Sequence, residues 1–595
     1  MFESPGKTKS VRQAWSESQE ELHETQPVSP VQKSERAKKK KKKRKTQQSG
    51  ERSASVPQLS TDTLSDTVCF ENGQDECTLN NNDEPIVRGI FQIEKKSHDV
   101  VLTASRVTWT PIRPETQPGD PSVPRKEAFV ELRDVFGVKT KRRRSIGQKV
   151  GGTLLGITLF YVRRKGTKLK DDELHLHNLS VDHCEVWFKH LKALLKGFKE
   201  RPKTLKVFVN PVSHKREALR IYMDDVVPLF KLADIDADLT VTERKGHALA
   251  VLQECSLEKY DGVVCVGGDG SVAEVAHGLL LRAQMDAGRD PDSVFTPVQA
   301  ALPLGVIPAG STDIVAYSVH GRRHALTAAL HIIMGHRQAV DVCSFSSMGR
   351  LLRFGFSAMF GFGGRTLALA ERNRWMPPGQ RREFAMIKML AHLKPEDCEL
   401  SFLPLKPTSH GTQEAAKTES SQDARDTDED GSWEATQGLF LNISIMAIPC
   451  LCSMAPRGLA PNTRLNNGSM ALILAKNTSR AEFVKHLKRY NSVNNQFSFP
   501  FVETHTVTAV KLRPKTQGHW SDEVSEEQEE GDSRSGPIIS SSEGTSTSTS
   551  YPWNIDGDLL EAPSELHIRV HPELLTLFGE DLEEVDESLI KCSCI

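Results

Sequence analysis

The sequence predicts a multidomain protein in which an all-β domain, an α/β domain and a second all-β region follow one another. Three patterns lead to this fold class. Residues 85–200 read as alternating strands with one closing helix, and residues 203–340 alternate between strand and helix patterns. Residues 341–514 and 551–578 return to strand patterns. A chain of 595 residues has room for about three such domains.

Composition favours a protein of a reducing compartment. The net charge is −1, and 11 cysteines occur without the spacing of a zinc site. The first residues, MFESPGKTKS, lack the apolar region of a secretory signal, and no run of about 18 apolar residues occurs. We therefore expect a soluble intracellular protein whose contacts with membranes are peripheral.

Several segments are too polar to form a core. We predict a disordered basic tail at residues 1–84, disordered insertions at 407–434 and 515–550, and an acidic C-terminal tail at 579–595. The first tail contains eight consecutive basic residues, Lys38–Lys45. Such a run fits a nuclear import receptor or another anionic partner, and the alternative is a merely solubilising tail.

These features predict a location in cytoplasm and nucleus, with peripheral association to internal membranes. The chain ends in Cys592-Ser593-Cys594-Ile595, which fits a prenylation box only loosely because acidic residues precede it.

Residues 85–200 resemble a pleckstrin-homology (PH) barrel. Their strand patterns end in an amphipathic helix that carries Trp187 and has apolar positions at Val186, Phe188, Leu191 and Leu194. A basic cluster, Lys139 and Lys141–Arg144, lies at an expected strand end. It suits an inositol phosphate headgroup or an anionic membrane surface. A second import signal and a plain solvated loop are the alternatives.

The stretch Asp261–Leu280 organises the α/β part. Val263–Val266 has the apolar, β-branched character of a buried parallel strand, and it stops at Gly267-Gly268-Asp269-Gly270. A helix pattern follows, with Ser271 and Glu274 spaced as a capping box. Glycines at a strand-to-helix turn suit phosphate binding, and Asp269 suits a general base or a ligand of Mg²⁺. The alternative is an ordinary tight turn.

A second strand-to-helix unit repeats this arrangement. Leu304–Ile307 is the expected strand, Pro308–Gly310 the turn, and Ser311 or Thr312 the cap of the next helix. Strand and helix alternate from Thr204 onward, which predicts a mostly parallel sheet with its ligand at the carboxyl ends of the strands.

The ordered set of motifs resembles the diacylglycerol, sphingosine and ceramide lipid kinases, most closely the ceramide kinases. The resemblance covers residues 204–578 and rests on Asn210-Pro211, Thr242-Glu243, His247-Ala248, Gly267–Gly270, Pro308–Asp313, Pro456–Leu459 and Asp556-Gly557-Asp558.

The resemblance implies a two-lobed enzyme that transfers phosphate from ATP, with Mg²⁺, to a primary hydroxyl of ceramide or a related lipid. The α/β lobe would bind the nucleotide, and a β-sandwich lobe would bind the lipid. Asp269 would be the catalytic base. The implied nucleotide-binding residues are Asn210, Pro211, Thr242, Gly267, Gly268, Gly270, Glu274, Gly310, Ser311, Thr312, Asp556 and Asp558.

The sequence departs from the family pattern in three places. Val212–Ala218 contains no glycine where the family has a glycine-rich turn. Arg365 ends the segment Gly361–Arg365, where the family has an acidic residue in the lipid site, and it requires a partner of its own. The segment Asn467–Ala471 lacks two further carboxylates of the family.

Two functions remain open at this stage. One is an active lipid kinase for ceramide or another lipid. The other is a binding protein with weak or no ceramide kinase activity, acting in sphingolipid-linked signalling or through partners. A nucleic-acid-binding role would rest on the basic runs alone, and the sequence shows no aromatic platform for it.

Overall fold

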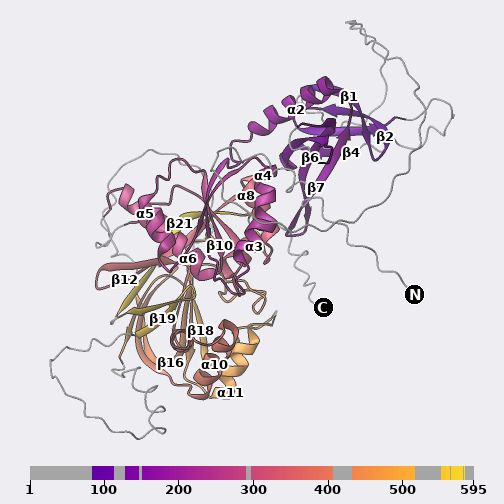
Figure 1. Ribbon diagram of the computed structural model, residues 1–595. Helices are drawn as coiled ribbons and strands as arrows, with labels where there is room; N and C mark the ends of the chain where they lie inside the picture. Colours follow the sequence, from indigo (N-terminus) through magenta and orange to yellow (C-terminus); the bar gives the residue numbers. More distant parts are fainter. Residues whose placement is uncertain are drawn as a thin grey trace, which may run out of the picture.

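The computed structural model describes residues 84–112, 128–146, 151–289, 296–405, 432–492, 494–515, 551–562, 565–580 and 582. The predictions for the basic run Lys38–Lys45, most of both insertions and the C-terminal cysteines lie outside these residues. Figure 1 shows three folded parts in chain order, which we name the first domain (84–198), the α/β lobe (204–334) and the β-rich lobe (337–578).

The first domain is a seven-stranded antiparallel sheet with one C-terminal helix. The strand order is β4-β3-β2-β1-β7-β6-β5, and the helix α2 (Val181–Lys196) begins where Ser180 accepts a hydrogen bond from the N–H of His183. Trp187 is fully buried against Phe91. The strands are β1 (Val87–Ile93), β2 (Lys96–Leu102), β3 (Arg106–Pro111), β4 (Ala128–Glu131), β5 (Val135–Arg143), β6 (Thr153–Lys165) and β7 (Lys168–His177). The strands and the helix agree with the prediction, and closure into a barrel stays a prediction.

The α/β lobe contains the predicted parallel sheet. Its strands run in the order β9-β8-β10-β11, and each neighbouring pair is parallel. They are β8 (Thr204–Val209), β9 (Asp236–Val241), β10 (Gly262–Gly267) and β11 (Leu304–Pro308). The helices are α3 (Ala218–Ile221), α4 (Val227–Leu232), α5 (His247–Glu254), α6 (Asp269–Asp286), α7 (Ile314–His320) and α8 (Ala325–Met334).

One predicted helix of this lobe is divided. Between α3 and α4 lies a π-helical segment, η3 (Tyr222–Val226), just before Pro228. Proline lacks the N–H that would bond to the carbonyl four residues earlier, so the helix widens ahead of it.

The β-rich lobe contains helices that the strand patterns did not predict. They are α9 (Phe362–Arg372), α10 (Pro378–Ala391) and α11 (Arg480–Arg489). The strands are β12 (Arg337–Ser347), β13 (Arg350–Gly355), β14 (Ser357–Gly361), β15 (Glu396–Pro404), β16 (Glu434–Met446), β17 (Met470–Lys476), β18 (Val502–Pro514), β19 (Tyr551–Ile555), β20 (Asp558–Ala562) and β21 (Leu566–Phe578).

Strand β21 joins the two lobes. It pairs antiparallel with β12 and β18, and Leu577 pairs in parallel with Leu304 of β11. The result is one 14-stranded sheet that passes through both lobes. A single hydrophobic cluster also contains Val263 and Leu304 of the first lobe together with Phe354 and Ile473 of the second. The two lobes are therefore joined by a shared sheet and a shared core.

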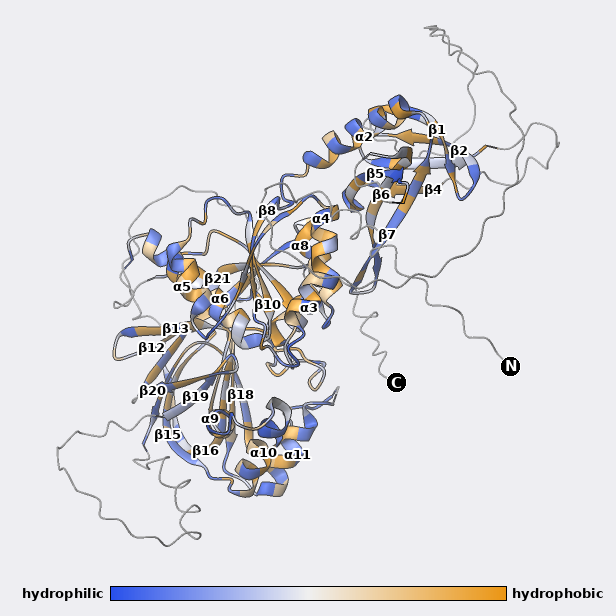
Figure 2. Cartoon of the chain, in the orientation of Figure 1, coloured by the Kyte–Doolittle hydropathy of each residue, from blue (hydrophilic) through white to orange (hydrophobic). Residues whose placement is uncertain are grey.

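The first domain packs against the α/β lobe. Phe136, Phe160 and Leu169 share a hydrophobic cluster with strand β8 and helices α4 and α8. Figure 2 shows apolar residues on α4 and α8 at this side of the lobe. No helix within the described ranges is long and apolar enough to cross a membrane.

Candidate functional site

Two glycine turns meet at the carboxyl ends of β10 and β11. Gly267 and Pro308 are partners in the parallel register. A Cβ atom at Gly310 would lie 2.4 Å from the Cα of Gly268, and one at Gly268 would lie 3.0 Å from the Cα of Gly310. Both glycines are therefore required by the close approach of two backbones. The sequence predicted both turns, and the fold brings them into contact.

Asp269 is the first residue of α6 and lies beside the next helix. Its Oδ1 accepts a hydrogen bond from the N–H of Val315 at 3.2 Å, in the first turn of α7. Burial raises the pKa of Asp269 to about 7, helped by the negative charges of Asp313 and Asp556 and opposed by the N–H groups of α7. A carboxylate with this pKa can accept a proton from a hydroxyl group near neutral pH.

The predicted capping box of α6 is wrong. The helix begins at Asp269, ahead of Ser271. Ser271 instead accepts a hydrogen bond from Nδ2 of Asn210 at 2.8 Å. Glu274 accepts the N–H of Ala248 at 3.0 Å, which ties α6 to the start of α5. Glu274, predicted to bind nucleotide, thus has a partner in the fold, and its role at the nucleotide stays a prediction.

The predicted cap of α7 is also wrong. Asp313, with a left-handed φ of 56°, occupies the position before the helix in place of Ser311 or Thr312. One oxygen of Asp313 accepts the N–H of Gly310 at 2.8 Å, and the other binds Arg323. The hydroxyl of Ser311 is therefore not used as a helix cap. It accepts a hydrogen bond from Arg382, which lies on α10 of the other lobe.

The turn that lacks glycine adopts a glycine-like backbone. His214 and Arg216 have φ values of 43° and 62°. Asn210 holds the start of the turn by accepting the N–H of Val212 at 3.1 Å, and Ser213 donates to the carbonyl of Ala309 at 3.2 Å. The turn therefore keeps a left-handed shape and lies directly against the turn that contains Gly310.

This turn contributes to a basic rim around the glycine turns. Burial lowers the pKa of His214, and the nearby charges of Arg323, Lys215 and Arg382 add to the effect. The rim therefore consists of His214, Lys215, Arg323 and Arg382. Sequence reasoning missed the two arginines, because they come from segments 13 and 72 residues after Gly310 and no motif marks them. A cluster of cations fits phosphate groups.

The other predicted nucleotide residues of the α/β lobe lie at strand ends nearby. Pro211 follows Asn210 in the turn after β8. Thr242 follows β9, where its N–H and its hydroxyl both donate to the carbonyl of Val209, at 2.9 and 3.4 Å. Both residues are thus at the carboxyl edge of the sheet, as expected.

The β-rich lobe contributes Asp556 and Asp558, which have different roles. Asp556 is buried, and it accepts the N–H groups of Phe356 and Ser357 at 2.9 and 2.8 Å and the Ser357 hydroxyl at 2.9 Å. Burial raises its pKa in spite of these donors. Asp556 therefore orients β14.

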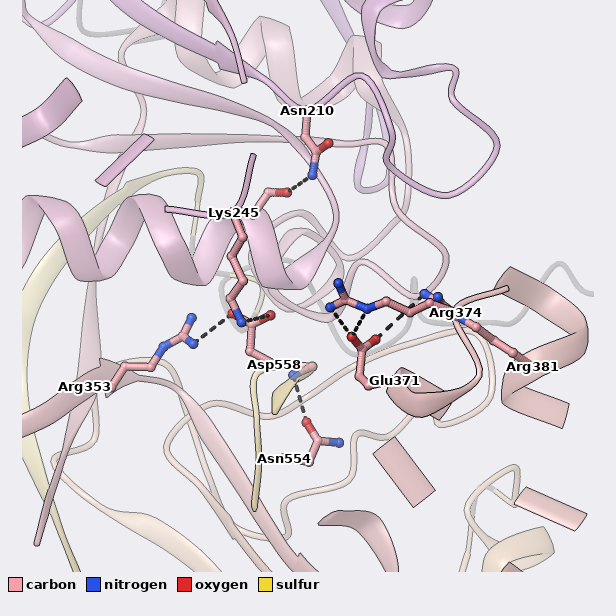
Figure 3. A network of polar contacts seen from close by, with 10 residues as sticks. Asn210, Lys245, Arg353, Glu371, Arg374, Arg381, Asn554 and Asp558 are labelled. Carbon is pink, nitrogen blue, oxygen red and sulfur yellow. Dashed lines mark hydrogen bonds and ion pairs between the residues drawn. The ribbon is translucent and has the colours of Figure 1, made fainter. Parts of the chain in front are cut away.

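Asp558 reaches across to the glycine turn. A Cβ at Gly270 would lie 3.3 Å from its Oδ1. Figure 3 shows Arg353 and Lys245 converging on this carboxylate, at 2.8 and 3.4 Å. Lys245 belongs to the α/β lobe, so this ion pair joins the two lobes. In the same view Glu371 of α9 is held by Arg374 and Arg381.

Arg365 has the partner that its burial requires. Its guanidinium lies 3.0 Å from Glu396 at the start of β15 and donates to the carbonyl of Lys394. Only 9% of the residue is exposed. The expected reversal of charge in the lipid pocket is therefore offset within the lobe, and Arg365–Glu396 is a buried ion pair.

The arrangement fits the phosphates of a nucleotide. The first turn of α6 presents N–H groups, the two glycines leave room for close approach, and the basic rim supplies charge. Because Asp313 and Asp556 are already committed to donors, Asp269 is the carboxylate best placed to hold Mg²⁺ or accept a proton. Within the described ranges, side chains gathered closely enough to share an ion are His331, His336 and Glu580, near the end of α8 and away from this site.

The basic cluster of the first domain is partly used inside the protein. Lys139 and Lys192 both form ion pairs with Asp234, which follows α4 of the α/β lobe. Burial lowers the pKa of Lys139. Arg142 and Arg143 stay exposed, with Arg142 donating to the carbonyl of Gly152 at 3.3 Å. Lys139 is thus withdrawn from the surface that was expected to meet anionic lipid.

Comparison with protein families defines the class. The ceramide kinase PH domain matches residues 87–191, the diacylglycerol kinase catalytic domain matches 204–345, and the ceramide kinase C-terminal domain matches 356–595. These are the domains of a lipid kinase of the ceramide type.

Individual relatives place the chain more closely. It is 54% identical over 530 residues to ceramide kinase-like protein of Homo sapiens, covering 84% of this chain and 91% of that protein. Ceramide kinase of Homo sapiens is 38% identical over 428 residues, covering 67% and 78%. The chain belongs to the ceramide kinase family. Among solved structures, a putative diacylglycerol kinase from Bacillus anthracis str. Sterne aligns with 14% identity and a TM-score of 0.43, over 66% of this chain and 97% of that one.

Proposed function

We propose that the protein binds ATP with Mg²⁺ between its lobes and a ceramide-related lipid in the β-rich lobe, with weak or no ceramide kinase activity. It would act in sphingolipid-linked signalling or through partner proteins. The proposal of nucleotide binding rests on the close contact of Gly268 with Gly310 beside a basic rim. Domains shared with ceramide kinase support the lipid part.

Each group of the site has a defined task in this proposal. The N–H groups of α6 and the cations Lys215, Arg323 and Arg382 bind phosphate oxygens. Asp269 faces the acceptor hydroxyl and takes its proton. ATP supplies the phosphoryl group when bound, and Mg²⁺ offsets its charge. Asp558, held by Lys245 and Arg353, keeps the two lobes in register.

Two features argue for weak phosphoryl transfer. His214 and Arg216 place Cβ atoms in a left-handed turn that adjoins the phosphate site, which limits the approach of backbone to phosphate. Arg365 pairs with Glu396 and donates to the carbonyl of Lys394, and a guanidinium cannot accept a hydrogen bond from a neutral lipid head. Small displacements of an acceptor hydroxyl cost about 100-fold in rate.

One observation favours an active kinase instead. The pKa of Asp269, raised to about 7, is that of a working general base near neutral pH. The second candidate function is therefore phosphorylation of a primary hydroxyl on ceramide or another lipid.

Thin-layer chromatography with labelled ATP over a panel of lipids separates the two functions. Calorimetric titration of a non-hydrolysable ATP analogue, with Mg²⁺, is the parallel binding measurement. Analogue binding without labelled lipid supports the first function, and labelled lipid that disappears in Asp269→Asn supports the second. Absence of analogue binding by a folded protein contradicts both.

The proposal extends to the cell. Lys38–Lys45 would direct part of the protein to the nucleus through an import receptor, and the PH domain would give peripheral contact with anionic membranes. Replacing the eight basic residues by alanine should shift a fluorescent fusion toward the cytoplasm. An unchanged nuclear fraction would contradict the import role of this run.

A further inference from the structure

The segment around α10 exposes large apolar side chains together. Trp375, three residues ahead of the helix, is 81% exposed. Ile387, Met386 and Phe384 on the helix are 68%, 46% and 40% exposed. We name these four residues the α10 surface. Exposed apolar side chains concentrated in one short segment at one end of a lobe indicate a contact surface, and Phe384 and Ile387 lie on one face of the helix.

The helix is apolar on both sides. Ala385 is fully buried and packs with Leu369 and Ala370 of α9, which accounts for the inward face. Phe384 and Ile387 are three positions apart, so they share a face that lies away from Ala385. A surface helix normally directs polar residues outward. The outward apolar face of α10 is therefore not explained by packing within the lobe.

The charges of the segment around α10 indicate what kind of partner the surface binds. Between Glu371 and Lys394 the chain has two acidic residues and six basic ones, whereas the whole protein has a net charge of −1. The basic residues are Arg372, Arg374, Arg381, Arg382, Lys388 and Lys394. An exposed tryptophan, aliphatic side chains and an excess of basic residues suit the interface of an anionic bilayer.

The position of α10 connects this surface with the glycine turns. Arg382, on the first half of the helix, donates a hydrogen bond to Ser311 in the glycine turn of the α/β lobe. Figure 1 shows α10 beside α11 at the end of the β-rich lobe that is remote from the first domain. A bilayer lying on α10 would thus lie close to the glycine turn that contains Ser311.

We infer that the α10 surface docks the β-rich lobe on an anionic membrane, independently of the first domain. Trp375 and Ile387 insert among the lipid head groups and upper acyl chains, and the positive charge of the segment, apart from Arg382 at the glycine turns, attracts the lipid phosphates. The inference deepens the proposed lipid-binding function, because it gives the route by which a bilayer lipid reaches the site.

The test measures sedimentation of the full-length protein with vesicles of phosphatidylcholine, with and without phosphatidylserine. Ile387→Glu should lower partitioning onto the anionic vesicles at least about ten-fold, since it removes one inserted side chain and adds a repelled charge. The matched control is Met348→Glu, because Met348 is 77% exposed in the turn between β12 and β13. This control should bind vesicles like the unmodified protein.

Fluorescence gives a second readout at the site. Vesicles should shift the tryptophan emission to the blue, and most of the shift should be absent in Trp375→Phe. Equal partitioning of Ile387→Glu and the unmodified protein would overturn the inference, as would equal loss in the Met348→Glu control. A changed sedimenting mass of Ile387→Glu in solution with unchanged vesicle binding would assign the surface to self-association and also overturn it.

Binding of the ATP analogue is measured on the same variants. Loss of vesicle binding with normal analogue binding supports docking through α10 and leaves the nucleotide site intact. Normal vesicle binding by a protein that binds no analogue contradicts the proposed nucleotide function and leaves the docking inference standing.

Discussion

The two lobes meet at the glycine turns but hold their charged groups differently. In the α/β lobe, burial and the charges of two nearby carboxylates raise the pKa of Asp269 to about 7. The N–H groups of α7 oppose this shift. In the β-rich lobe, Asp556 has three donors, Arg365 has Glu396, and Asp558 has Arg353. Burial raises the pKa of both Asp269 and Asp556, so the lobes differ in what these carboxylates hold. Asp269 lies beside the glycine turns, whereas Asp556 holds the backbone of β14.

The largest expected effect comes from breaking the buried pair of the β-rich lobe. Glu396→Gln should lower the free energy of unfolding by about 3–5 kcal/mol, because it leaves the Arg365 guanidinium buried without its counter-charge. Denaturant unfolding of the two proteins measures the difference. By the same reasoning, Arg365→Asp alone would place a carboxylate beside Glu396 and should also destabilise the lobe.

A neighbouring pair on the same strand is the matched control. Glu399 lies 3.5 Å from Lys515, and its side chain is 49% exposed. Glu399→Gln should therefore change stability by less than about 1 kcal/mol. Equal effects of the two substitutions would show that burial does not make the Arg365–Glu396 pair more important for stability than an exposed pair.

The second prediction concerns the backbone contact in the α/β lobe. Gly310→Ala would place a Cβ 2.4 Å from the Cα of Gly268, so the turns must separate. We expect a loss of about 1–3 kcal/mol in stability and weaker binding of the ATP analogue. Thermal unfolding and calorimetry measure these effects. Gly379→Ala is the control, since a Cβ there meets nothing within 4 Å. Unchanged analogue binding in Gly310→Ala would remove this contact from the site.

Sequence patterns predicted the parts of the site that depend on local signals. The glycine turns, the strands before them and the α/β alternation were visible because each lies within about 20 residues. The start of α11 also has a local signal in the sequence. Ser479 and Glu482 have the spacing of a capping box, and the N–H of Glu482 bonds to Ser479 at the start of α11.

The rest depends on contacts between distant segments. The sequence around Arg365 does not indicate that Glu396 is its partner. The sequence around Ser271 likewise does not indicate that Asn210 donates a hydrogen bond to its hydroxyl. The pairing of β21 with strands of both lobes likewise links residues more than 200 positions apart. Periodicity describes the face of an element, so it cannot specify these pairings.

The third prediction uses the raised pKa of Asp269. An unfolded aspartate has a pKa of 3.8 and the native one about 7, so the native state binds more protons between these values. Stability therefore falls as pH rises through this range, and the cost is complete above it. Asp269→Asn keeps an acceptor for Val315 and loses the charge. The variant should be more stable than the unmodified protein at pH 8, with little difference at pH 4.

Comparing Asp269→Asn with the unmodified protein isolates the contribution of Asp269. Asp313 and Asp556 also have raised pKa values, but they are present in both proteins. Any lipid phosphorylation should disappear in Asp269→Asn, while binding of the ATP analogue persists. A stability difference that does not vary with pH would contradict the raised pKa of Asp269.

The smallest expected effect comes from the turn that lacks glycine. His214→Gly and Arg216→Gly should each stabilise the protein by about 0.5–1 kcal/mol, because both positions have left-handed backbones that cost an L-residue energy. Lys215→Gly is the matched control, since Lys215 does not have a positive φ, and it should stabilise nothing. His214→Gly should also bind the ATP analogue more tightly by a small factor, because it removes a Cβ beside the phosphate site and keeps Lys215 in place. If all three substitutions lower stability equally, the turn does not strain its backbone, and crowding there cannot explain weak phosphoryl transfer.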